Sequence, residues 1–328
     1  MEWRQVDGGL RVGGTSETHM PRFTKLLLCV TQDDDAAVRY VARLAAATSA
    51  DLTIADVIED VPPLARRLLP RSWNLPALVR AQKQARIDRS AAIARRLGVA
   101  PTTALLTGSP IKALVREVVR GGHDLLAVDA TSSGTVTCVE ASATGLLREV
   151  PCPVLLVRPS RRRRRPRILV AVDTGPSVSK GTRALAAKLI RTALWFAEKH
   201  DGELHVVHAW IPYGERMIIR AGLTEVESRQ FMVGMREEAR DELERTIAPF
   251  RARIDPAHVH LVKGDPRLVI GDFAASHRID LLVVGTVGRT GVAGRIIGNT
   301  AEAVLHQLPC SMLVVKPDDG RARGRRPK

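Results

Sequence analysis

The stretch that decides the fold is LLVVGTVGRTGVAGRIIGNT, residues 281–300. Its first four residues are aliphatic and a glycine follows at once, which is typical of a short strand buried on both faces. Gly285, Gly288 and Gly298 then frame a loop, and the apolar spacing of residues 301–308 predicts an amphipathic helix after it. The order of strand, glycine loop and helix predicts an α/β domain.

The glycine loop has the properties of a phosphate-binding loop. Glycine permits positive φ and close approach of a ligand, and the free N–H groups at the start of a helix attract anions. The alternative is a tight crossover that binds no ligand. The loop is not a P-loop, because no Gly-Lys-Ser or Gly-Lys-Thr follows the glycines.

The chain contains an internal repeat. Residues 108–110 (GSP) match residues 264–266 (GDP), and residues 124–126 (DLL) match residues 280–282 (DLL) at the same separation. A third match joins Pro151-Cys152 to Pro309-Cys310. One duplicated unit explains these matches most simply.

Apolar runs alternate with helical patterns in both copies, which predicts parallel sheets of a doubly wound type. The helices expected from the pattern include one over residues 75–97, one that begins at Pro110, and one opened by a capping box between Thr224 and Glu227. Phe231, Met232 and Met235 on this last helix are expected to be core or dimer contacts. The expected strands are residues 25–31, 51–57, 103–107, 124–130 and 153–158 in the first copy and 168–173, 204–209, 281–284 and 312–315 in the second.

The spacing Gly-x2-Gly-x9-Gly, followed by Asn299 and Thr300, resembles the ATP-binding loop of the universal stress protein family. The segments GTVGRTG and GNTAE resemble the tandem, two-domain branch of that family. The resemblance implies two Rossmann-like α/β domains of the adenine nucleotide alpha hydrolase type, each a parallel sheet of about five strands with helices on both faces. The expected organisation is a leader (1–22), a first domain (23–159), an arginine-rich linker (160–166), a second domain (167–317) and a basic tail (318–328).

The same resemblance implies a stress-response regulatory protein that binds ATP, or a related adenine nucleotide, in its second domain. Whether a magnesium ion accompanies the nucleotide is left open. Ligands of open α/β sheets lie at the carboxyl ends of the strands, where the strand order reverses. Asn299 departs from the family pattern, which usually has Ser or Thr directly after the last glycine. The implied contacts are Val172 and Asp173 to the nucleoside, the backbone of Ala209, Val284 and Gly285 to the sugar or first phosphate, Gly288, Gly298, Asn299 and Thr300 to the phosphates, and Arg289 as an added positive charge.

The first copy lacks these features. Asp129 stands where Gly285 stands in the second copy, and only Gly134 and Gly145 follow it. A carboxylate there repels phosphate, and its Cβ blocks close approach. We therefore expect a first domain that binds no nucleotide and serves as a structural or partner-binding half.

The formal net charge of +15 is concentrated in two places. Arginine runs at residues 161–165 and in the tail supply most of the excess and are expected to be solvated, so we expect no nucleic-acid partner. Binding of nucleic acid or of an anionic membrane through these segments is the alternative. Aromatic residues make up 3% of the chain, which leaves few stacking platforms for single strands.

The remaining features predict a cytoplasmic protein. The four cysteines show no CxxC spacing, no apolar run is long enough to span a membrane, and the polar leader is no secretory signal. Met20 is an alternative start. Family members pair domains through the last strand, so residues 154–157 and 312–315 are the expected pairing edges, either within the chain or in a homodimer.

Catalysis has little support in the sequence. ATP hydrolysis or nucleotidyl transfer needs a positioned base or metal carboxylate, and only Asp173 is in range; the enzyme interpretation is kept as an alternative. His205 and His208 are expected on opposite faces of one strand. His258 and His260 share a face but have no evident third ligand, so no metal site is expected there.

Overall fold

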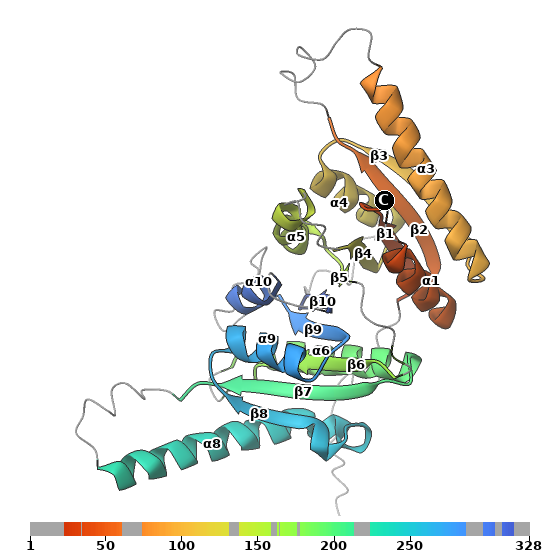
Figure 1. The fold of residues 1–328 in the computed structure, drawn as a ribbon. Helices are drawn as coiled ribbons and strands as arrows, with labels where there is room; N and C mark the ends of the chain where they lie inside the picture. Colours follow the sequence, from red (N-terminus) through yellow and green to blue (C-terminus); the bar gives the residue numbers. More distant parts are fainter. Residues whose placement is uncertain are drawn as a thin grey trace, which may run out of the picture.

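The computed structural model describes ten separate parts of the chain (Figure 1). The expected leader and tail, and with them Met20, lie outside the described residues, as do Gly134, Gly288 and Arg289. The side chains of residues 138–143 are likewise not described. The described parts are residues 23–33, 35–60, 74–130, 138–158, 163, 165–175, 178–212, 224–286, 298–305 and 310–317.

The first half alternates strands and helices as the sequence predicts, and the strands end one or two residues from their expected ends. Pro110 begins a helix, as its fixed φ favours. The elements are β1 (Lys25–Cys29), α1 (Ala36–Thr48), β2 (Asp51–Ile58), α3 (Leu75–Arg96), β3 (Thr102–Thr107), α4 (Pro110–Gly121), β4 (Leu125–Asp129), α5 (Cys138–Glu149) and β5 (Val154–Val157).

The second half repeats the same order. Two short 3₁₀ helices, Ala248–Arg253 and Pro256–His258, precede its third strand. The elements are β6 (Arg167–Ala171), α6 (Lys180–Lys199), β7 (Glu203–Trp210), α8 (Glu225–Ile247), β8 (Val259–Lys263), α9 (Pro266–Ser276), β9 (Leu281–Gly285), α10 (Asn299–Leu305) and β10 (Ser311–Val315).

All ten described strands form one sheet in the order β3-β2-β1-β4-β5-β10-β9-β6-β7-β8. Neighbouring strands are parallel within each half, and the halves join where β5 pairs with β10 in antiparallel direction. Leu155 lies opposite Leu313 at this junction. The expected internal pairing through the last strands is therefore confirmed, and the two expected sheets are one continuous sheet.

Helices cover both faces of the sheet, as predicted (Figure 1). One face is packed by α1, α3, α6 and α8, and the other by α4, α5, α9 and α10. Each of the two cores contains buried aliphatic side chains from both halves. Because the inner parallel strands are covered twice, their residues are nearly all apolar and buried, whereas the edge strands β3 and β8 are partly exposed.

Aromatic contacts also cross between the halves. Phe23, which precedes β1, packs edge-on against Trp195 of α6 at a ring-centroid distance of 5.2 Å, and it also contacts Phe196. Tyr40 of α1 stacks on His200 at the end of α6. Burial raises the pKa of the Tyr40 hydroxyl well above its usual range. The two copies therefore share their hydrophobic interior.

The start of α8 is fixed by the predicted capping box. The Thr224 side chain accepts a hydrogen bond from the Glu227 amide, and the Glu227 carboxylate accepts one from the Thr224 amide. These bonds lower the pKa of the Glu227 carboxyl. The expectation that Phe231 lies in the core is wrong, since its side chain is exposed; Met232 and Met235 are half-buried, and a dimer contact here stays a prediction.

Thr224→Ala should cost about 1 kcal/mol of local helix stability, because the Glu227 backbone amide in the first turn loses its acceptor. We expect faster hydrogen exchange at the first turn of α8 and an unchanged global unfolding transition. A matched change at half-buried Ser228, to Ala, should leave exchange unaltered. A global loss of stability in Thr224→Ala would contradict a purely local cap.

Two arginines of the expected linker are described, and both lie near acidic residues. Arg163 is 3.9 Å from the Asp280 carboxylate, and Arg165 is 3.1 Å from the Asp201 carboxylate. The other arginines of the run lie outside the described residues. These two side chains are therefore partly neutralised, which reduces the charge that the linker offers to a nucleic acid.

Candidate functional site

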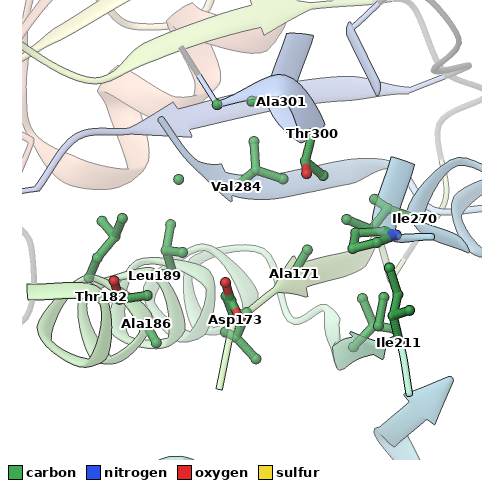
Figure 2. Close-up of a pocket in the computed structure, with 17 residues that line it drawn as sticks. Ala171, Asp173, Thr182, Ala186, Leu189, Ile211, Ile270, Val284, Thr300 and Ala301 are labelled. Atoms are coloured by element: carbon green, nitrogen blue, oxygen red, sulfur yellow. The ribbon is translucent and has the colours of Figure 1, made fainter. Parts of the chain in front are cut away.

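A pocket opens at the carboxyl ends of β6 and β9 (Figure 2). These strands are neighbours in the sheet, but the chain leaves β6 toward β7 on one side and reaches β10 from β9 on the other. This reversal is the switch point at which open α/β sheets bind ligands. The cavity has a volume of about 290 Å³, near the lower end of small-molecule sites.

Most of the residues expected from the sequence line this pocket. Asn299 begins α10 but is not among the lining residues, and the implied contacts of Gly288 and Arg289 lie outside the described residues. Asp173 follows β6 directly and supplies a carboxylate to the cavity (Figure 2). The expected residues that line the pocket are Val172, Asp173, Ala209, Val284, Gly285, Gly298 and Thr300.

The apolar walls of the pocket were missed by the sequence analysis. Helix α6 contributes one wall and the start of α9, with Ile211, contributes another. The repeated Gly-Asp-Pro motif was a usable signal for the second wall, because it follows a strand and therefore lies at the same edge as the glycine loop. The wall residues are Thr182, Leu185, Ala186, Leu189, Ile211, Pro266 and Ile270 (Figure 2).

Gly285 favours close packing and does not adopt a positive φ. A Cβ at this position would lie 2.8 Å from the Leu185 Cδ2 atom of α6, and Gly285 is not among the glycines with positive φ. Its missing side chain lets α6 lie close to the end of β9, beside the cavity.

Hydrogen bonds to neighbouring backbone groups hold several polar groups at this edge of the sheet. His208 is buried, and its Nδ1–H donates to the Val172 carbonyl oxygen at 3.0 Å. The Asp173 Oδ1 atom accepts a long hydrogen bond of 3.5 Å from the Gly175 amide. The Gly298 amide donates to the Thr286 carbonyl oxygen. His205 points to the opposite face from His208, as predicted, and lies two residues before Val207, which lines the pocket.

The sequence matches the family model "Universal stress protein family" twice, over residues 22–158 and 165–316. The chain belongs to the universal stress protein family. The two matches correspond to the two copies of the repeat, so the chain is a tandem member of the family. The predicted family and fold class are confirmed.

Curated relatives carry the name universal stress protein E. The protein of Escherichia coli K12 is 32% identical over 212 residues, which cover 64% of this chain and 66% of the relative. The homologue from Haemophilus influenzae is 34% identical over 173 residues, which cover 52% of this chain and 54% of the relative. The match thus spans less than two thirds of either relative's length.

Solved universal stress proteins share the fold of nearly the whole chain. A putative member from Pseudomonas aeruginosa has a TM-score of 0.61 at 24% identity and covers 90% of this chain and 94% of its own. A member from Archaeoglobus fulgidus has a TM-score of 0.59 at 17% identity and covers 90% and 97%. At these identities the likeness concerns the fold alone.

The first half of this universal stress protein is built differently at the matching edge. Thr31 and Asp129 occupy the positions that Asp173 and Gly285 hold in the second half, and Asp129 is buried. Nearby, the buried Asp56 carboxylate pairs with Lys83 at 2.8 Å and with Arg86 at 3.0 Å. Ion-paired side chains of β2 and α3 thus lie beside the equivalent edge. That the first half binds no nucleotide stays a prediction.

No helix in the described parts of the chain is long and apolar enough to cross a membrane. The described cysteines Cys29, Cys152 and Cys310 are free and buried. Burial raises the pKa of each of these thiols to about 12, so they are protonated and unreactive at neutral pH.

Proposed function

We propose that this universal stress protein is a stress-response regulatory protein that binds ATP or a related adenine nucleotide in the pocket of its second half. The observation that carries the proposal is the gathering of seven expected residues around one cavity at the switch point of the sheet. Membership of the family and the glycine spacing of the loop support the same ligand class.

The chemistry of the pocket suits the parts of such a nucleotide. The aliphatic walls from α6 and α9 offer an apolar surface to the base, and the Asp173 carboxylate accepts hydrogen bonds from base or ribose. Glycines at 285 and 298 leave backbone close to the cavity without side chains, which suits phosphate oxygens. Asp173 is the acidic side chain among the described lining residues, so a magnesium ion would be held chiefly by the phosphates.

A regulatory output is favoured over hydrolysis, because Asp173 is the acidic side chain among the described lining residues. Phosphoryl transfer requires a metal-binding or water-positioning side chain besides the cradle, and Asp173 alone would have to supply it. Hydrolysis on this scaffold is the second candidate. We place the protein in the cytoplasm and regard a homodimer, beyond the internal pairing of β5 with β10, as a further proposal.

Asp173→Asn should weaken ATP binding about tenfold, because hydrogen bonds to a charged group are worth about 1.5 kcal/mol or more. The measurement is a titration of the full chain with ATP. Asp201→Asn, which changes an exposed carboxylate at the other edge of the sheet, should bind as the unchanged protein does. Equal affinity in Asp173→Asn would exclude Asp173 as a ligand contact.

The ligand itself is identified by denaturing the purified protein and analysing the released small molecules by mass spectrometry. Intact ATP supports storage and sensing, whereas ADP that appears with time in a sealed sample supports hydrolysis. A variant with Gly288→Val, which crowds the expected phosphate loop, should release none. Release of a compound without an adenine base would contradict the proposed ligand class.

A further inference from the structure

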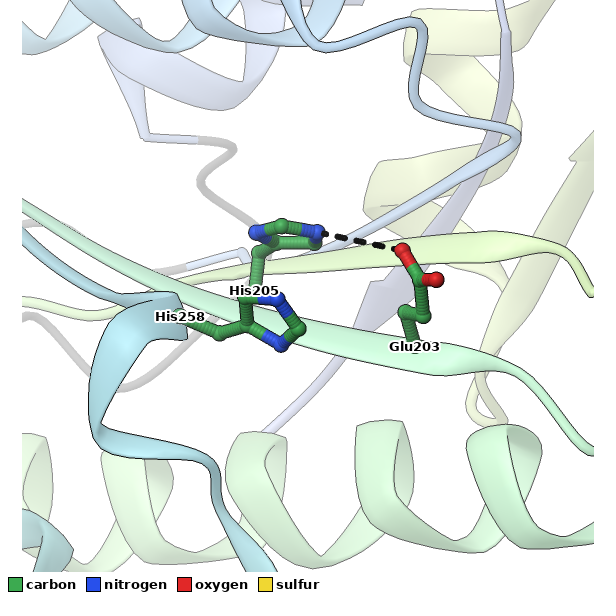
Figure 3. A group of neighbouring side chains, drawn as sticks. All are labelled: Glu203, His205 and His258. Carbon is green, nitrogen blue, oxygen red and sulfur yellow. Dashed lines mark ion pairs between the residues drawn. The ribbon is translucent and has the colours of Figure 1, made fainter.

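Histidines and one glutamate gather on one face of β7 and β8, at the edge opposite to the pocket (Figure 3). Glu203 and His205 are two residues apart on β7 and therefore share a face. His258 ends the 3₁₀ turn before β8, and its ring centroid lies 4.3 Å from that of His205. Val207, which lines the pocket, follows His205 by two residues, or about 7 Å along the strand.

The three side chains bring their ligand atoms close together. One ligand atom from each of Glu203, His205 and His258 lies within 4.8 Å of the other two. The His205 Nε2 atom and the Glu203 Oε2 atom are 4.0 Å apart (Figure 3). In a tetrahedral zinc site, with bonds of about 2.0–2.2 Å, ligand atoms are about 3.4 Å apart. Small rotations of the half-buried Glu203 and His258 side chains would close the difference.

The His205 ring is already arranged as a ligand. Its Nδ1 atom lies 3.2 Å from the His260 Nε2 atom, while its Nε2 atom is buried and has no hydrogen-bond partner among the described residues. When Nδ1–H donates to His260, Nε2 carries a free lone pair. This is the arrangement in which an outer group fixes the tautomer of a metal-binding histidine. The ring is 6% exposed, so an unpaired Nε2 is costly without a ligand.

Burial, followed by the neighbouring His258 and His260, lowers the pKa of His205 to about 4.

The two halves differ at this place. Glu203 and His205 correspond to Asp51 and Thr53, because Arg167 pairs with Glu203 in the same register as Lys25 with Asp51. In the first half the Thr53 hydroxyl is hydrogen-bonded to that of Thr102, at 2.8 Å, where the second half has His205 and His258. The fold therefore accepts two hydrogen-bonded threonines at these positions, and histidines occur there only in the second half.

A hollow of about 450 Å³ is lined by Glu203 and His258 of the cluster. Its other carboxylates are those of Glu198, Asp201 and Asp255, of which Glu198 pairs with Arg253 and Asp201 with Arg165. Arg167 opposes binding, since its Nε is 3.2 Å from the Glu203 Oε2 atom. A bound ion must therefore share the Glu203 carboxylate with Arg167 or displace the Arg167 side chain from it.

We propose that Glu203, His205 and His258 form a binding site for a divalent transition-metal ion. Two imidazoles and one carboxylate, with a position left open for water, match zinc best. His260 acts as the outer partner of His205. His277 is not a ligand, because its Nδ1 lies 3.1 Å from the Phe273 carbonyl oxygen and its ring stacks on Phe273. The site lies at the amino end of β7, whereas the nucleotide pocket lies at the carboxyl ends of the strands.

The test is a titration of the full chain, without a histidine tag and without nucleotide, with zinc chloride. We expect one zinc ion per chain and at least a hundredfold weaker binding in His205→Thr and in His258→Thr. These variants carry the residues of the first half, so we expect them to fold. Glu203→Gln should bind about tenfold more weakly, and His277→Gln, the matched control within the cluster, should bind as the unchanged protein does.

Cobalt(II) gives an independent readout, because its visible spectrum reports the ligand type. We expect the spectrum of a tetrahedral or five-coordinate nitrogen and oxygen site, lost in folded His258→Thr. No zinc binding by the unchanged protein would overturn the proposal. So would equal binding in folded His258→Thr, or a thiolate charge-transfer band that is lost in Cys138→Ser.

Discussion

Gly285→Asp is expected to reduce the affinity for ATP more than a hundredfold. The substitution gives the second half the residue that the first half has at this position, Asp129. At a separation of about 5 Å and an effective dielectric constant of about 20, one carboxylate opposes one phosphate charge by about 3 kcal/mol. Each 1.4 kcal/mol corresponds to a factor of ten in affinity.

Gly285→Ala separates this charge effect from crowding. An added Cβ meets the end of the flexible Leu185 side chain, so a small shift relieves the contact and the loss of affinity should be much smaller. Both variants are compared by calorimetric titration with ATP after their folding is checked by circular dichroism. Retained affinity in folded Gly285→Asp would show that the phosphates lie elsewhere.

Leu155→Ala is expected to destabilise the whole chain by about 2–5 kcal/mol. The Leu155 side chain is fully buried, and the residue lies opposite Leu313 where the two halves join. Its removal costs the transfer free energy of the lost atoms and leaves a cavity in the core that both halves share. Because this core is continuous, we expect a single unfolding transition at a lower temperature.

The measurement is differential scanning calorimetry with circular dichroism on the same samples. Val119→Ala provides the control, because the Val119 side chain is exposed on α4 and its truncation should change little. Two separate transitions, of which only one shifts in Leu155→Ala, would contradict the shared core.

Much of the fold could be predicted because local signals agreed with the global arrangement. Aliphatic runs such as residues 125–129 are buried on both faces of a parallel sheet, so their composition alone distinguishes them from loops. The repeat then predicted the second half from the first. The joining of β5 to β10 was foreseen only as one of two options, since the sequence of an edge strand does not identify its partner.

The candidate site was predictable in part, for a physical reason. Glycines and Asp173 mark the strand ends, whereas the walls of α6 and α9 consist of ordinary aliphatic residues such as Leu189 and Ile270. Such residues look alike whether they face a core or a cavity. The role of Gly285 in packing against Leu185 likewise depends on a contact between elements far apart in the sequence.

The histidine cluster shows the same limit. His205, His258 and Glu203 come from adjacent strands, and their proximity depends on the register between β7 and the segment before β8. From the sequence alone, His258 and His260 share a strand face, and no third ligand is evident beside them. In the structure the third group is Glu203, which is distant from His258 in the sequence.

The central claim is tested most directly by calorimetric titration of the full chain with ATP. The proposed pocket in the second half and the altered edge of the first half predict one nucleotide per chain. No heat of binding, or two nucleotides per chain, would contradict the claim that the second half alone carries the nucleotide site.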